Sequence, residues 1–68
     1  MRPILSTNDP VRLSFIVALL ADAGIETVVF DTHASVADGS IGAIPRRLMV
    51  DDDLHARATM ILRQAGEL

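Results

Sequence analysis

Hydrophobic side chains recur along the chain with two different periods. Residues 2–7, 26–31 and 46–50 are short runs of apolar and β-branched side chains bounded by turn-forming residues, a pattern typical of β-strands. Residues 10–23 and 54–65 instead place apolar side chains three or four positions apart, as one face of an α-helix requires. The pattern therefore predicts the order strand, helix, strand, strand, helix.

The first predicted helix has clear start and stop signals. Asp9 is a favoured N-cap residue, and Pro10 suits the first helical position because an N–H there would have no partner in the helix. Gly24 fits the left-handed position after the helix, and Ile25 can fold back on Leu20 as in a Schellman ending. These residues predict a helix that ends at about residue 23.

The apolar side chains of this helix cover a wide arc, which predicts that the helix is buried on two sides. We expect a core of aliphatic side chains and alanine, because the chain has only two aromatic residues, Phe15 and Phe30. Both are assigned to that core. The apolar positions of the helix are Leu13, Phe15, Ile16, Val17, Leu19, Leu20 and Ala23.

These elements can assemble in few ways. A right-handed crossover between the first two strands, and a hairpin between the second and third, insert the third strand between the others. The prediction is an α+β fold, a truncated ferredoxin-like β-α-β-β-α unit whose three-stranded antiparallel sheet has the order 1-3-2 and carries both helices on one face. Residues 1–68 would form a single domain. Pro3 cannot donate to a strand ladder, so the first strand is expected at a sheet edge.

The other face of this sheet has no predicted cover. Alternation puts Leu48 and Val50 on the core face of the last strand, and Met49 on the opposite face together with Ile4 or Leu5. Natural proteins rarely leave such a face and a free strand edge unprotected. We therefore predict that a second copy covers it and that the protein is a homodimer.

Composition narrows the class of protein. The chain has no cysteine, which excludes disulfide bonds and thiolate metal sites. The chain has six arginines and nine carboxylates, and the resulting net charge of −3 disfavours nucleic acid as a partner. The longest apolar run, Phe15–Ala21, is too short to cross a membrane, and residues 1–5 are too short for a signal peptide. We expect a cytoplasmic protein without a membrane partner.

The connection between the second and third strands holds the candidate contact residues. Residues 32–45 are longer than most hairpin loops and carry apolar side chains, which either form a small satellite core or meet a partner. Arg46 and Arg47 point to opposite faces of a strand, so at most one of them can clamp an anion with the loop; the alternative is a salt bridge to Asp31. We predict contact with a partner protein or a small anionic ligand here. The predicted contact residues are His33, Val36, Ile41, Gly42, Ile44, Arg46 and Arg47.

No catalytic residue, cofactor or metal site is predicted. The alternative, a small hydrolase or metal-dependent enzyme, would use His33 with Asp31 and Asp38, but no third ligand has the spacing of a known motif. Asp51–Asp53 is more simply a helix cap than a cation site, because it lacks the ligand spacing of a calcium loop. Gly39–Gly42 lacks the Lys-Ser/Thr of a phosphate-binding loop.

Three segments, in their order and spacing, resemble one known family: Leu5–Pro10 (LSTNDP), Leu20–Ile25 (LADAGI) and Gly42–Val50 (GAIPRRLMV). Over nearly its whole length the chain is similar to the putative prokaryotic signal-transducing proteins, a small bacterial family. The resemblance implies a fold similar to the PII-like signalling proteins, in which a long connection between strands 2 and 3 contacts effectors and partner proteins. It carries over no nucleotide-binding residues. With the apolar connection, it leads to the hypothesis of a small non-enzymatic regulatory or protein-interaction module.

Overall fold

The computed structural model describes residues 1–31 and 45–68, and their elements follow the predicted order. Each observed boundary lies within one residue of its prediction. The elements are β1 (Arg2–Thr7), α1 (Pro10–Asp22), β2 (Thr27–Asp31), β3 (Arg46–Val50), a 3-10 turn η2 (Asp52–Leu54) and α2 (His55–Gln64).

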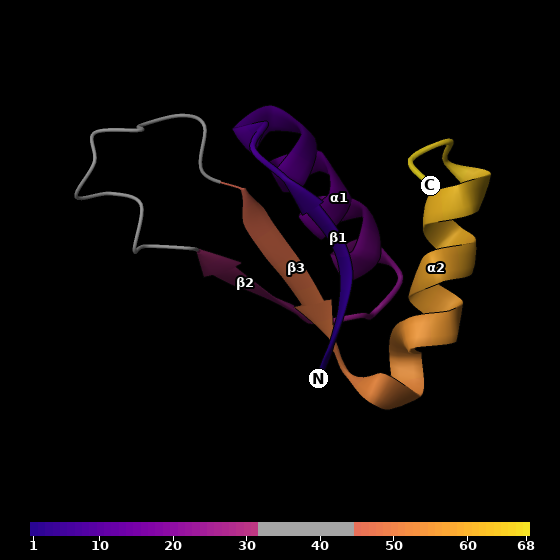
Figure 1. Cartoon of the computed structure of the whole chain (residues 1–68). Coiled ribbons are helices and arrows are strands. Elements are labelled where there is room, and N and C mark those ends of the chain that lie inside the picture. Colours follow the sequence, from indigo (N-terminus) through magenta and orange to yellow (C-terminus); the bar gives the residue numbers. More distant parts are fainter. Residues whose placement is uncertain (32–44) are drawn as a thin grey trace, which may run out of the picture.

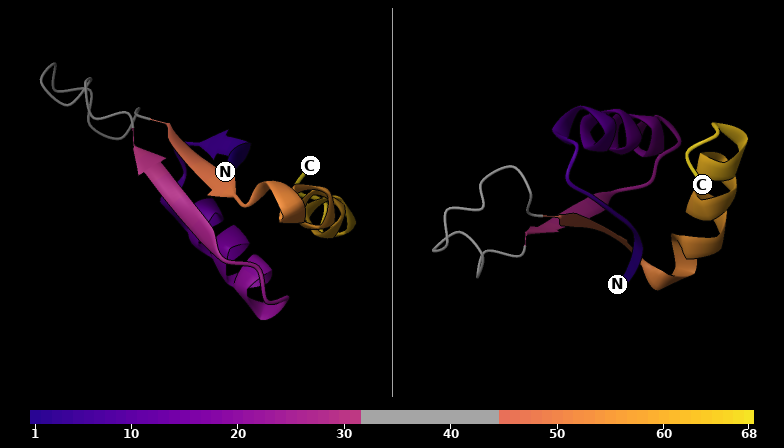
Figure 2. Two further views of the ribbon diagram at one scale, coloured as in Figure 1. Left: turned by 90° about the horizontal axis from the view of Figure 1, so that it is seen from below. Right: turned by 45° about the horizontal axis from the view of Figure 1, so that its top comes forward.

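The strands form one antiparallel sheet in the order β1-β3-β2, with β3 in the centre (Figure 1). The predicted sheet order and the truncated ferredoxin-like α+β fold are therefore confirmed, and Pro3 lies in an edge strand as expected. Helix α1 lies along one face of the sheet, and α2 stands at the end of the sheet where β3 finishes (Figure 2). Of the described helices, none is both long enough and apolar enough to cross a membrane.

Both end signals of α1 work as the sequence predicts. The Asp9 carboxylate accepts a hydrogen bond from the backbone N–H of Val11 at 2.9 Å, which satisfies a donor that the first helical turn leaves free. Gly24 has a φ of +80°, in the region that side chains disfavour. The N–H of Ile25 then donates to the carbonyl of Leu20 at 2.9 Å, which is the reversed bond of a Schellman ending.

The aspartates before α2 also form a cap. The Asp51 carboxylate accepts a hydrogen bond from the N–H of Asp53 at 3.1 Å and opens the 3-10 turn that leads into the helix. At the other end, Gly66 has a φ of +78° and the N–H of Glu67 donates to the carbonyl of Leu62 at 2.8 Å. The cap interpretation is confirmed for Asp51 at the 3-10 turn, whereas Leu54, the N-cap residue of α2 itself, makes no side-chain cap bond.

The core lies between the sheet and the two helices and is entirely aliphatic, as the composition predicts. The assignment of the two aromatic residues to it is wrong, because Phe15 is 52% exposed and Phe30 is 47% exposed. Helix α1 buries one side rather than two, and Phe15 lies outside that side. The core residues are Leu13, Ile16, Leu20, Ile25, Leu48, Val50, Ala58 and Leu62.

An irregularity in β1 corrects a second expectation. The register with β3 shifts between Pro3 and Leu5, so that Ile4 is an extra residue in the strand. Ile4 and Leu5 both pack against the core, whereas simple alternation puts one of them on the opposite face. The expectation that Ile4 or Leu5 lies on the uncovered face is therefore wrong.

Polar contacts fix α2 to the rest of the domain. The Arg12 guanidinium donates to the Glu67 carboxylate at 2.9 Å and to the Glu67 carbonyl at 2.8 Å. Arg57 donates to the carbonyl of Ala23 at 3.2 Å. The Nε2 atom of His55 lies 3.1 Å from the carbonyl oxygen of Pro3, at hydrogen-bond distance. Since these bonds reach α1 and β1, they hold the helix at both of its ends.

Candidate protein interface on the open sheet face

The sheet face opposite the core is built by the register of the three strands. Side chains that are directly opposite in neighbouring strands share a face, so each row across the sheet can be assigned from Leu48, which points into the core. Two rows fall on the other side, where in the described part of the chain no helix lies. We call these residues the open face: Pro3, Met49 and Val28 in one row, and Ser6, Arg47 and Phe30 in the next.

Exposure on the open face rises from the centre of the sheet to its edge. Met49 in the central strand is only 9% exposed because Pro3 and Val28 flank it on both sides. Val28 is 37% exposed and Phe30 is 47% exposed, since among the described strands β2 has a neighbour on one side only. The result is an apolar surface that continues across two neighbouring strands, from Met49 to Val28.

Arg47 is the cationic group of this surface. It is exposed and lies opposite Phe30 in the ladder. Within residues 1–31 and 45–68, its guanidinium forms no hydrogen bond or ion pair. Arg46 stands opposite Asp31 on the other face, so the expectation that the two arginines point to opposite faces is confirmed. An arginine beside an aromatic ring can meet a carboxylate through two parallel hydrogen bonds.

The predicted contact residues divide into two groups. Arg46 and Arg47 are described, and the register separates them onto different faces. The others lie outside the described residues, together with Asp38 of the metal alternative. Where the structure is described, no three His, Cys, Asp or Glu side chains are grouped so that they could hold a metal ion. The predicted contact residues outside the described part are His33, Val36, Ile41, Gly42 and Ile44.

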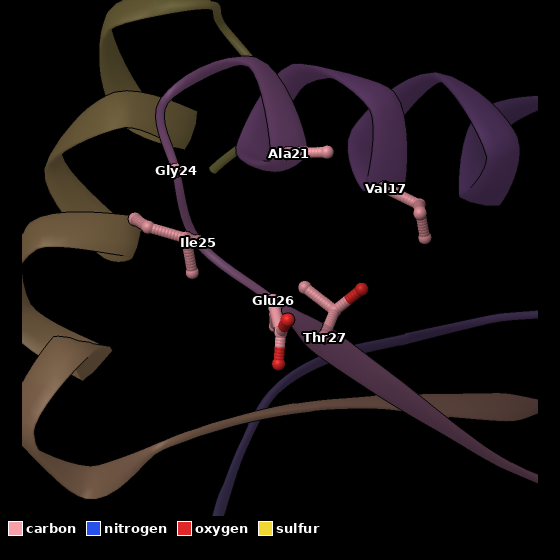
Figure 3. Close-up of a pocket in the computed structure, with 6 residues that line it drawn as sticks. All are labelled: Val17, Ala21, Gly24, Ile25, Glu26 and Thr27. Carbon is pink, nitrogen blue, oxygen red and sulfur yellow. The ribbon is translucent and has the colours of Figure 1, made fainter.

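A groove of about 480 Å³ lies on the core side of the sheet, between the end of α1 and the start of β2 (Figure 3). Val17 and Ala21 line it from the helix, and Thr27 reaches toward them from the strand. Its one charged lining residue among the described side chains is Glu26. The groove thus offers apolar surface, one hydroxyl and one carboxylate. Such a lining is typical of a surface that packs against another segment, and it lacks the several convergent polar groups of a catalytic site.

A comparison with known protein families identifies the family of the chain. A family model described as putative prokaryotic signal transducing protein matches residues 1–66. The chain belongs to this family. No curated protein and no solved structure matches the chain. The family resemblance predicted from the sequence is thereby confirmed, and the description of the family agrees with the general expectation of a role in signal transduction.

Sequence reasoning missed that Phe30 belongs to the open face. Val28 and Phe30 share a face of β2, as alternation along a strand requires, and Arg47 shares a face with Met49 in β3. What was missing is the register between β2 and β3, which puts Val28 beside Met49 rather than beside Leu48. Val28 and Val29 are the same residue type and point to opposite faces, so the hydrophobic pattern of β2 does not indicate which face of the strand is buried.

Proposed function

We propose that the chain is a small non-enzymatic regulatory module of signal transduction, which binds a partner protein through the open face. The observation that carries the proposal is the juxtaposition of exposed Val28 and Phe30, buried Met49 and the exposed Arg47 on one uncovered sheet face. Family membership supports the signalling role. A homodimer also remains part of the proposal, through a contact that leaves the open face accessible, because a second copy on that face would exclude the partner.

The open face suits a protein segment better than a small anion. A small anion is bound by several convergent donors, and this face carries one arginine, because Arg46 points to the other side. Phe30 and Val28 instead offer apolar contact area next to that arginine. A partner segment with apolar side chains and a neighbouring carboxylate matches this arrangement. Contact by the five predicted residues outside the described part stays a prediction, and the proposal does not depend on them.

Affinity capture with matched variants tests the proposal. The bait is the wild-type chain or the double variant Phe30→Thr and Arg47→Gln, exposed to a lysate of the source organism. We expect the double variant to lose a defined partner that the wild type captures, and to bind the purified partner at least about tenfold more weakly. Far-UV circular dichroism confirms that each bait is folded.

The matched control changes one exposed apolar side chain and one arginine on α2. Met60 is 61% exposed and Arg63 is exposed, and neither lies on the open face. The double variant Met60→Thr and Arg63→Gln should capture the partner as the wild type does. If the open-face variant retains every captured protein at wild-type affinity, the open face is not the binding surface and the proposal is wrong.

A further inference from the structure

The two edges of the sheet are protected to different degrees. The edge at β1 carries Pro3, which cannot donate a ladder hydrogen bond, and the extra residue Ile4 breaks the regular register there. Prolines and bulges are the devices by which natural proteins prevent another strand from pairing with an edge. A second chain therefore finds no regular ladder along β1.

The edge at β2 has none of these devices. Thr27–Asp31 pairs with β3 residue by residue without a shift, and it contains no proline or glycine. Residues 27–30 are uncharged, and Val28, Val29 and Phe30 are 37%, 39% and 47% exposed. A regular, exposed and apolar edge of this kind is a template for one more strand.

The flank of α1 beside β2 is apolar, and Glu26 is the one charged residue among the described side chains that line the groove there. The groove beside the strand is lined from α1 by Val17 and Ala21 (Figure 3). Of the charged residues of α1, Arg12 is bonded to Glu67, and Asp22 is in the last turn of the helix but does not line the groove. Because each copy carries a net charge of −3, a contact between two copies requires a nearly uncharged surface such as this one.

The β2 segment is complementary to itself when a second copy runs antiparallel to it. A two-fold axis at Val29 puts Val29 opposite itself, Val28 opposite Phe30 of the second copy, and Thr27 opposite Asp31 of the second copy. Pairs of an aromatic and a β-branched side chain are among the favourable cross-strand pairs. The register that centres on Val29 therefore keeps the apolar side chains of both copies in contact.

The helices leave room for this pairing. Helix α1 contacts β1 and β2 alike, so it lies over the middle of the three-stranded sheet. In a continuous sheet, the central strands of the two copies would be about 14 Å apart, which is three strand spacings. Packed helices need about 8–10 Å between their axes. The two α1 helices can therefore lie side by side without a clash.

We propose that β2 pairs with β2 of a second copy, antiparallel about a two-fold axis at Val29, and that this joins the two sheets into one of six strands. The pairing is made by the strand edge and partner binding by the open face, and Val28 and Phe30 contribute side chains to both. It differs from the face-to-face dimer expected from the sequence, because both open faces stay accessible. The two open faces then form one surface. Across it, Met49 and Val28 of one copy lie in the same row as Phe30 and Arg47 of the second copy.

A charge exchange at the axis tests the proposal. Val29→Lys places two like charges at the centre of the dimer contact, whereas in the monomer a lysine on an edge strand is well tolerated. Sedimentation from low to high micromolar concentration should show a dimer for the wild type. It should show dissociation at least about tenfold easier for Val29→Lys and for Val29→Glu alone. An equimolar mixture of these two variants should recover the dimer, because the introduced lysine of one chain then faces the introduced glutamate of the other.

The control is Met60→Lys, a change at an exposed apolar residue on α2, which should dimerise as the wild type does. The proposal is overturned if the wild type is monomeric at high micromolar concentration, or if Val29→Lys dimerises like the wild type. It is also overturned if the mixture of the Lys and Glu variants is no more dimeric than either alone. The partner capture described for the open face gives a separate readout, so the two proposals can fail independently.

A cysteine cross-link covers the case in which the charged variants do not fold. The wild-type chain has no cysteine, so Val29→Cys introduces a single thiol at the proposed axis. Under mild oxidation we expect a disulfide-linked dimer to form within the concentration range in which the wild type dimerises. Met60→Cys should stay largely unlinked. Equal cross-linking of the two variants contradicts the β2 pairing, because only Val29 is expected to meet itself.

Discussion

On the core face of β3, Leu48 and Val50 are fully buried; on the other face, Met49 is 9% exposed and Arg47 is exposed. The first pair belongs to a cluster that includes side chains of both helices. Met49 is screened only by its neighbours in the sheet, Pro3 and Val28. Low exposure therefore has two different origins in one strand, and only that of Leu48 and Val50 involves packing against the helices.

The difference between the faces separates stability from binding. A side chain in the cluster loses contacts on every side when it is truncated, and the surrounding atoms cannot all relax into the space. A side chain on the open face borders solvent, so its truncation leaves no closed cavity. Residues that bind a partner can therefore be changed at little cost to folding, which is the condition that the proposed variants need.

The largest effect is expected on the core face. Leu48→Ala should lower the free energy of unfolding by about 2–5 kcal/mol, because it removes buried methyl groups and leaves a cavity beneath both helices. Urea unfolding followed by circular dichroism measures the change. For a chain of 68 residues this is a large share of the total, so the variant is unsuitable as a binding control. A loss below about 1 kcal/mol would show that the two faces do not differ as described.

A smaller effect is expected directly across the strand. Met49→Ala removes a side chain of nearly equal burial, but the space that it leaves opens to solvent. We expect a loss of about 1–2 kcal/mol in the free energy of unfolding. The same urea titration checks it, with Leu48→Ala as the reference. If Met49→Ala is as costly as Leu48→Ala, then the open face is packed like a core, and the interpretation of Met49 changes.

Some elements of the fold can be predicted from the sequence better than others. The helix ends are local, since Asp9, Gly24 and Asp51 act within a few residues of themselves, and each of them does what its residue type predicts. The sheet order follows from general rules of chain connection and is also correct. These features could be predicted because few alternatives compete with them.

The composition of the open face could not be predicted in the same way. The phase of β2 is set by its register with β3, and a segment with apolar residues on both sides accepts either phase. In β1, the extra residue Ile4 adds a side chain to the core face, and nothing in residues 2–7 marks that position. Phe30, and one of the pair Ile4 and Leu5, were therefore assigned to the wrong faces for one reason, the lack of a local signal for register.

The smallest effect gives the sharpest comparison of the two faces. Val28 and Val50 are the same residue type in neighbouring strands, but Val28 is 37% exposed and Val50 is 0% exposed. Threonine keeps the shape and the β-branching of valine and adds a hydroxyl group. In Val28→Thr, water can satisfy that hydroxyl, so the free energy of unfolding should change by less than about 0.5 kcal/mol. In Val50→Thr, the hydroxyl is placed among aliphatic side chains, and a loss of about 1–3 kcal/mol is expected. Urea unfolding of both variants, at a concentration where sedimentation shows only monomer, measures the difference. Equal losses would mean that Val28 is as completely covered as Val50, and the open face would then be closed in the isolated chain.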